Sequence, residues 1–309
     1  MNTPKETALN TRSFIKKHYH HFWQVVAHVL PLIIILNIFT MSMTDYIVTS
    51  VFDHSDIEPT SPSFTVLGYS LSLFTVIWAL NITHMAMNGY LMAVIAISWH
   101  RLVINGSENY RIMSIFIPRW HEIQFITLLA VLYIIVYGSF FAFPILMMSL
   151  PFSIAMMDFG YIFPVMMLVL GCFMAFLFFK CSFYFPAKAA NRQITIMQSF
   201  DLTRGYFGKI ILSYIRASWR VGLAATIYSA VLMFLTPYLM QLIYSPANNA
   251  FDSAPSTWAL HGITLIMGLP FMIFFSPMFL VIGVTIVSNY YLQSISEPEQ
   301  NDDIYEDML

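Results

Sequence analysis

Residues 22–48 read FWQVVAHVLPLIIILNIFTMSMTDYIV, an apolar run whose single charged side chain, Asp45, lies near its end. A helix needs roughly 20 predominantly apolar residues to cross the hydrocarbon core of a bilayer, and this run is long enough. It lacks the short apolar core and small-residue cleavage pattern of a secretory signal peptide. We therefore predict a retained membrane-spanning helix with Pro31 inside it.

The composition of the whole chain extends this prediction. The 309 residues are 58% hydrophobic and only 10% charged, and the mean hydropathy is +0.70. Soluble domains carry about 25% charged residues, and the surface of a globule of this size needs polar cover. The composition excludes an ordinary soluble domain and predicts an all-α, polytopic transmembrane helix bundle.

Further apolar runs alternate with polar segments along the chain. The predicted spans after the first lie at about 64–104, 121–149, 162–184, 218–243 and 258–292, the last one kinked by Pro270 and Pro277. They give about six spans in a transmembrane domain over residues 22–292. A basic, polar segment at 1–21 precedes this domain, and an acidic tail at 293–309 follows it, which we expect to be disordered.

The stretch 64–104 could be one span or two, because a straight helix of this length would be about 60 Å long. Cytoplasmic loops are enriched in Lys and Arg. A single crossing, with a bend allowed at Asn88-Gly89, places all 14 Lys and Arg residues on one side. Two crossings would put Arg101–Arg119 outside. We therefore predict one crossing, a cytoplasmic N-terminus and a multi-pass protein of the bacterial cell inner membrane.

Three polar residues share one face of the second predicted span. Asn81, His84 and Asn88 are three and four residues apart, which places them on one side of a helix. Polar side chains in a span usually face protein or water. They could form a small polar or proton-handling site, or they could be hydrogen-bonding glue between helices. No carboxylate lies at the centre of a span, which argues against an acidic proton relay.

A basic stripe precedes and enters the fifth predicted span. Lys209, Ser213, Arg216 and Arg220 follow a 4-3-4 spacing, so that one helical face carries them all. Such a stripe would favour anionic lipid headgroups by about 1 kcal/mol for each charge near the surface. The other reading is ordinary cytoplasmic anchoring by side chains that reach back to the interface.

Enzyme and metal signatures are missing from the sequence. We find no P-loop, GxSxG, HExxH or dinucleotide-binding fingerprint. Cys172 and Cys181 make neither a disulfide framework nor a zinc set, and His18, His20 and His21 read as solvated histidines beside the membrane. The sequence predicts no enzyme activity, cofactor, metal site or nucleic-acid partner.

Two stretches carry a family resemblance. One is Trp99–Glu108, WHRLVINGSE; the other is Lys180–Ala187, KCSFYFPA, followed by Ser199–Phe207, SFDLTRGYF. Together they resemble the YciC-like inner-membrane proteins and the membrane domain fused to some glycerophosphodiester phosphodiesterases, here without the catalytic domain. The resemblance implies six spans and no specific activity.

The second stretch also has a physical interpretation as a turn at the membrane surface. We expect Lys180 to anchor the end of a span and Pro186 to stop or kink the helix. Asn191 could cap a short helix over about 192–204, and Gly205 suits a left-handed position after it.

The leading functional hypothesis is a non-enzymatic scaffold or lipid-associated accessory. Its basic cytoplasmic face would contact anionic lipid or a membrane-protein partner. The alternative is a small-solute transporter or permease component with its polar site at Asn81, His84 and Asn88. An intramembrane enzyme using His84 or His261 lacks an evident carboxylate or nucleophile.

Overall fold

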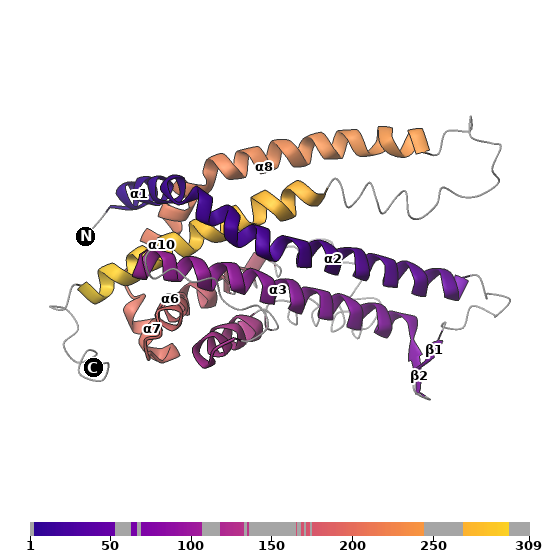
Figure 1. Cartoon of the computed structure of the whole chain (residues 1–309), viewed down its shortest axis with the longest axis horizontal. Coiled ribbons are helices and arrows are strands. Elements are labelled where there is room, and N and C mark those ends of the chain that lie inside the picture. Colours follow the sequence, from indigo (N-terminus) through magenta and orange to yellow (C-terminus); the bar gives the residue numbers. More distant parts are fainter. Residues whose placement is uncertain are drawn as a thin grey trace. The chain divides into compact units, whose positions relative to one another are not determined.

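The structure, a computed structural model, describes residues 3–52, 63–66, 69–106, 118–132, 135, 165, 168–169, 171–173, 175–243 and 268–296. Apart from one short hairpin, the elements in these ranges are helices (Figure 1). They are α1 (Pro4–Lys17), α2 (Tyr19–Phe52), β1 (Ser63–Val66), β2 (Tyr69–Ser72), α3 (Leu73–Asn105), α6 (Tyr184–Ala189), α7 (Ile196–Leu202), α8 (Phe207–Ile243), the π-helical turn η3 (Phe271–Phe275) and α10 (Ser276–Ser296).

Four described helices are long and apolar enough to cross a membrane, which makes this a multi-pass membrane protein. These spans are Tyr19–Thr44, Ile82–Asn105, Phe207–Thr236 and Gly268–Ser296. They correspond to four of the predicted runs. Of the predicted spans 121–149 and 162–184, the structure describes the shorter apolar helices Trp120–Leu132 and Gly171–Lys180. The rest of these two runs lies outside the described residues, so six spans and their orientation remain predictions.

The ambiguous stretch 64–104 contains one long helix. α3 continues through Asn88 and Gly89 without a break, and a single candidate span ends at Asn105. The start of the stretch instead forms an antiparallel hairpin in which Val66 lies opposite Tyr69. Its β-branched and aromatic residues suit strands, and we did not predict this hairpin.

The irregular helix at the last span lies between its two prolines. Pro270 precedes η3, and Pro277 is the second residue of α10. Because a proline nitrogen has no hydrogen to donate, the ordinary helical ladder cannot continue through Pro277. A π-helical turn is one way in which a helix absorbs such an interruption.

The N-terminal segment contains a helix that we did not predict. Thr3 caps α1 in a capping box, with its side chain accepting from the Glu6 amide and the Glu6 carboxylate accepting from the Thr3 amide at 2.8 Å. Pro4 at the first helical position suits this start. The polar and basic segment 1–21 is therefore helical over most of its length.

Contacts divide the chain into two compact units, each with its own core. One comprises residues 1–19, 92–217 and 281–309; the other comprises residues 20–91 and 218–280. In the second unit, the Trp23 ring stacks on Phe274 at 6.5 Å and Tyr228 contacts Phe275 at 5.8 Å. The first unit contains both stretches of the family resemblance.

Candidate functional site

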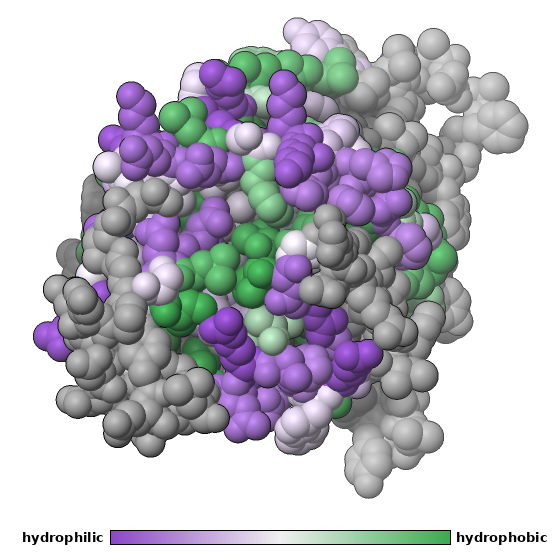
Figure 2. All heavy atoms as spheres, turned by 60° about the vertical axis from the view of Figure 1, so that its left-hand side comes forward, coloured by the Kyte–Doolittle hydropathy of each residue, from purple (hydrophilic) through white to green (hydrophobic). Residues whose placement is uncertain are grey.

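Basic residues gather in the first unit, which we call the cationic unit. All described Lys and Arg residues except Arg220 belong to it: Lys5, Arg12, Lys16, Lys17, Arg101, Arg119, Lys180, Lys188, Arg192, Arg204, Lys209 and Arg216. Its described carboxylates are Glu6, Glu122 and Asp201. Figure 2 brings the end with α1, α6 and α7 forward and shows hydrophilic side chains across this face. The described residues of the cationic unit therefore carry a large excess of positive charge, whereas the full sequence of this unit contains 13 basic and 11 acidic residues, six of the acidic ones in the tail 297–309.

Helix α1 is fastened to the start of α8 by side-chain contacts to backbone carbonyls. The Arg12 guanidinium donates to the carbonyls of Arg216 and Ala217, the latter at 3.3 Å. Ser213 contacts the Pro4 carbonyl at 3.3 Å and the Tyr290 hydroxyl at 2.9 Å. α1, α8 and α10 are thus joined within this unit.

The KCSFYFPA and SFDLTRGYF stretches form one hydrogen-bonded joint. The Ser199 hydroxyl donates to the Lys180 carbonyl at 3.0 Å and accepts from the Tyr184 amide at 3.0 Å. Thr203 reaches the same Lys180 carbonyl at 3.5 Å. Because these groups lie where one helix ends and α6 begins, the hydroxyls satisfy backbone atoms that have no partner within a helix. This part of the resemblance has a structural role.

The WHRLVINGSE stretch contributes buried hydrogen bonds to α10. The Trp99 indole donates to the Thr285 hydroxyl at 2.8 Å, and His100 Nδ1 lies 2.7 Å from the Ser288 hydroxyl. All four side chains are buried. These bonds give α3 and α10 a fixed rotation relative to one another within the unit.

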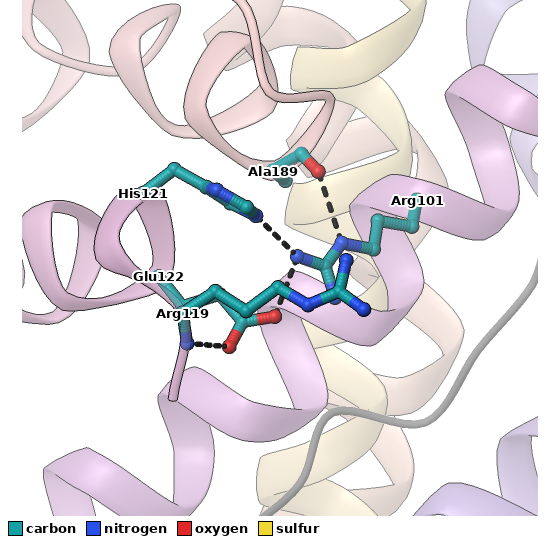
Figure 3. A network of polar contacts seen from close by, with 5 residues as sticks. All are labelled: Arg101, Arg119, His121, Glu122 and Ala189. Carbon is teal, nitrogen blue, oxygen red and sulfur yellow. Dashed lines mark hydrogen bonds and ion pairs between the residues drawn. The ribbon is translucent and has the colours of Figure 1, made fainter. Parts of the chain in front are cut away.

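Arg101, at the end of the same α3 span, is the centre of a buried polar network (Figure 3). Its Nη2 lies 2.6 Å from Glu122 Oε1 and 3.0 Å from His121 Nε2, and its Nε donates to the Ala189 carbonyl at 3.0 Å. The Arg119 amide donates to Glu122 Oε2 at 2.7 Å. Each carboxylate oxygen of Glu122 therefore has a donor within hydrogen-bonding distance.

The Arg101 network fixes the chemistry of its members. A guanidinium can only donate, so His121 Nε2 accepts and the neutral ring carries its proton on Nδ1. The relative exposures of the Arg101 and Glu122 side chains are 12% and 3%. A carboxylate this deeply buried requires a charged partner, and Arg101 supplies it.

Two further cations lie beside the Arg101 network. Lys188 directly precedes Ala189, whose carbonyl accepts from Arg101 Nε, and the Arg119 amide donates to Glu122. Figure 3 shows the exposed Arg119 side chain extending toward the Arg101 guanidinium. Lys188 is 8% exposed, and its ammonium lies over the Tyr184 ring at 5.2 Å. Burial lowers the pKa of Lys188, because water no longer solvates its charge fully.

Sequence reasoning missed the Arg101 network and Lys188. One signal was available: Glu122 is three residues after Arg119, at the start of an apolar run, which is a spacing typical of a helix-capping carboxylate. The meeting of Arg101 with Glu122, and of both with α6, depends on tertiary packing and has no local signature.

The predicted basic stripe on α8 is only partly exposed. Arg216 and Arg220 are exposed, Lys209 is half-buried, and Ser213 between them is buried against Tyr290. Lys209 lies over the Tyr206 ring at 5.2 Å, and Arg220 lies over the Trp219 ring at 5.4 Å. The stripe therefore follows the edge of the packed face of α8.

The predicted polar face on α3 shows one local pair. His84 and Asn88 are half-buried, and His84 Nε2 lies 2.5 Å from Asn88 Nδ2. Asn81 belongs to the same helix, but its side chain lies outside the described part of the structure. Because the observed partners are one turn apart, this contact does not join two helices.

Among the described residues, no group of His, Cys, Asp or Glu has a metal-ligating arrangement. His20 and His21 both contact the Gln24 side chain, at 2.9 and 3.2 Å. Cys172 is exposed, Cys181 is buried, and neither forms a disulfide.

Comparisons with protein-family models, with curated proteins and with solved structures found no match to this chain. The resemblance to the YciC-like proteins therefore remains a prediction.

Proposed function

We propose that this multi-pass protein is a non-enzymatic scaffold or lipid-associated accessory of the bacterial inner membrane, with the basic residues of the cationic unit on the cytoplasmic side and in contact with anionic lipid headgroups. The observation that carries this proposal is the charge of the described part of the cationic unit, where twelve cations far outnumber three carboxylates. Basic residues near an anionic leaflet each contribute about 1 kcal/mol of attraction.

The local contacts of this unit support the same role. The serine, threonine and histidine hydrogen bonds of this unit either join packed helices or satisfy backbone groups at a helix end, which is a structural role. Arg216 and Arg220 remain exposed on α8, where they can reach phosphate groups. The positive-inside rule supports a cytoplasmic orientation, and the resemblance to six-span inner-membrane proteins supports the location. A membrane-protein partner could use the same surface.

The test compares lipid retention by two charge-matched triple variants in native mass spectrometry. The stripe variant is Lys209→Gln with Arg216→Gln and Arg220→Gln. The control is Lys5→Gln with Lys16→Gln and Lys17→Gln, three exposed cations of α1. We expect retained phosphatidylglycerol to fall severalfold more in the stripe variant than in the control, with retained phosphatidylcholine unchanged in both. Equal phosphatidylglycerol retention in all three proteins would refute the stripe as the lipid contact.

A further inference from the structure

One face of the helix Trp120–Leu132 is packed inside the cationic unit. Glu122 and Phe125 are buried on this face. The Phe125 ring lies 6.0 Å from the His100 ring of α3 and 4.9 Å from the Phe185 ring of α6. Together with the ion pair that Glu122 forms with α3, these contacts fix which side of the helix points outward.

The outward face of the same helix is exposed and largely apolar. The exposed fractions are 72% for Trp120, 38% for Ile123 and 45% for Val131, and the exposed Thr127 lies between the last two. These positions are three or four residues apart, so they form one continuous face along the helix. Water solvates such a face poorly and hydrocarbon solvates it well. The pattern is typical of a helix face that contacts lipid.

Polar residues mark the end of this outward face at which Trp120 lies. Arg119 and His121 flank Trp120 in the sequence, and His121 and Glu122 both contact the Arg101 guanidinium (Figure 3). Ionised side chains are costly at the centre of a bilayer, so this end of the helix belongs at the bilayer surface. An indole ring is apolar but carries one N–H donor, and such rings favour the headgroup level.

We propose that Trp120 anchors the protein at the bilayer surface, with its ring in the headgroup layer and with Ile123 and Val131 facing the hydrocarbon. The partner of this face is lipid, and the Arg101–Glu122 pair lies at headgroup depth. Trp99 has no such role although it also lies near a span end, because it is fully buried and donates to Thr285.

Quenching by brominated lipids tests the position of the Trp120 ring. The full chain keeps one of its six tryptophans, Trp120 or Trp99, with phenylalanine at the other five positions. Each protein is reconstituted in phosphatidylcholine vesicles brominated either near the headgroup or deep in the acyl chains. We expect bromines near the headgroup to lower the Trp120 emission about twofold and deep bromines to lower it less, because indole rings favour the headgroup level. Trp99 is the matched control and should be quenched less by either lipid.

Three results would overturn the anchor. Trp120 emission that aqueous acrylamide quenches, and that neither lipid quenches, would place the ring in water. Emission shielded from acrylamide and from both lipids would mean that protein covers the ring. Stronger quenching by deep bromines would place the ring in the hydrocarbon.

Nitroxide labels provide a second measurement that retains Trp99. They are attached to Trp120→Cys, Val131→Cys or Asn10→Cys in a Cys172→Ser, Cys181→Ser background, where Asn10 is an exposed polar residue of α1. The ratio of collisions with oxygen to collisions with a water-soluble nickel chelate rises with depth in a bilayer. We expect this ratio to be lowest at Asn10→Cys, severalfold higher at Trp120→Cys and highest at Val131→Cys. Equal ratios at the three positions would contradict the proposal.

This inference goes beyond the proposed function, and the two can fail separately. The phosphatidylcholine vesicles contain no anionic lipid, so the position of Trp120 is measured without any contribution from the basic stripe on α8. A correctly placed Trp120 in a protein that retains no phosphatidylglycerol would support the anchor and refute the stripe.

Discussion

Glu122 illustrates how one residue can serve two parts of the structure. Its carboxylate caps the helix Trp120–Leu132 through the Arg119 amide and pairs with Arg101 from α3. Taking both charges out of water costs several kcal/mol for each ion, and their attraction must offset that cost. Removing one charge leaves the other buried without a partner, whereas removing both charges leaves no unpaired charge behind.

We therefore predict strong coupling between Arg101 and Glu122. Glu122→Gln keeps an oxygen that can accept from the Arg119 amide but removes the charge, and it should lower the free energy of unfolding by about 3–5 kcal/mol. Arg101→Met should cost a similar amount, and the double variant Arg101→Met with Glu122→Gln should cost much less than the sum. Denaturant unfolding in mixed micelles measures all three. Additive losses would mean that the two residues act independently.

Glu6 gives a pH-dependent prediction at the surface of α1. Hydrogen bonds from the Thr3 amide and hydroxyl lower the pKa of Glu6. The ionised carboxylate therefore stabilises the folded helix at pH values above the pKa of an unfolded glutamate. This stabilisation is lost as the pH falls through the lower pKa of the folded state. Hydrogen exchange at the first turn of α1, corrected for intrinsic rates, should accelerate in that acidic range.

Glu6→Gln should remove this pH response without removing the cap. α7 provides an internal control, because its capping box joins Thr195 to Gln198, which does not titrate. Exchange that accelerates equally in both helices as the pH falls would point to general unfolding and would exclude Glu6 as the cause.

At the scale of single elements, the turn between α7 and α8 depends on a glycine. Gly205 has φ = +85°, and a Cβ built there meets nothing within 4 Å. Any loss in Gly205→Ala would therefore come from the backbone conformation, which costs other residues roughly 1–2 kcal/mol. We expect Gly205→Ala to lower the free energy of unfolding by that amount.

Gly208→Ala is the matched control for this element. Gly208 lies in the first turn of α8, where a Cβ also has open space and φ is ordinary. Alanine favours helix over glycine by up to about 1 kcal/mol, so Gly208→Ala should be neutral or stabilising in the same unfolding measurement. If both substitutions destabilise equally, the positive φ of Gly205 is not the cause of the loss.

The same turn shows which element features the sequence predicts. Gly205 was expected to be left-handed, and it is. The proposed cap at Asn191 was wrong: Asn191 has φ = 61° and follows α6, and α7 begins later, at Ile196, after the Thr195 cap. A capping box satisfies two backbone amides at once, so Thr195 with Gln198 defines the start better than Asn191 alone.

Other elements were missed for different physical reasons. The Thr3–Glu6 capping box before α1 was a local signal that we could have used. The hairpin of β1 and β2 lies inside an apolar run, where hydropathy does not distinguish strand from helix. The Arg101–Glu122 contact joins residues that are far apart in the chain, so that no local pattern encodes it.

At the scale of the whole molecule, the sequence predicts the membrane class well, because length and apolarity alone are sufficient for a span. All four candidate spans overlap predicted runs. The charges predict orientation only through the positive-inside rule, which depends on insertion rather than on contacts in the folded chain. Orientation and the number of spans therefore need a measurement made in a membrane.

We predict that Ser153, between the third and fourth predicted spans, lies on the opposite side of the membrane from Lys16. In a Cys172→Ser, Cys181→Ser background, a membrane-impermeant maleimide should label Ser153→Cys from outside intact cells. It should label Lys16→Cys only after lysis. Asn249→Cys, in the predicted outer loop 244–257, serves as the positive control.

If residues 121–184 did not cross twice, Ser153→Cys would behave like Lys16→Cys, and the six-span arrangement would be wrong. Labelling of Lys16→Cys from outside would instead reverse the orientation and remove the cytoplasmic lipid contact from the proposed function.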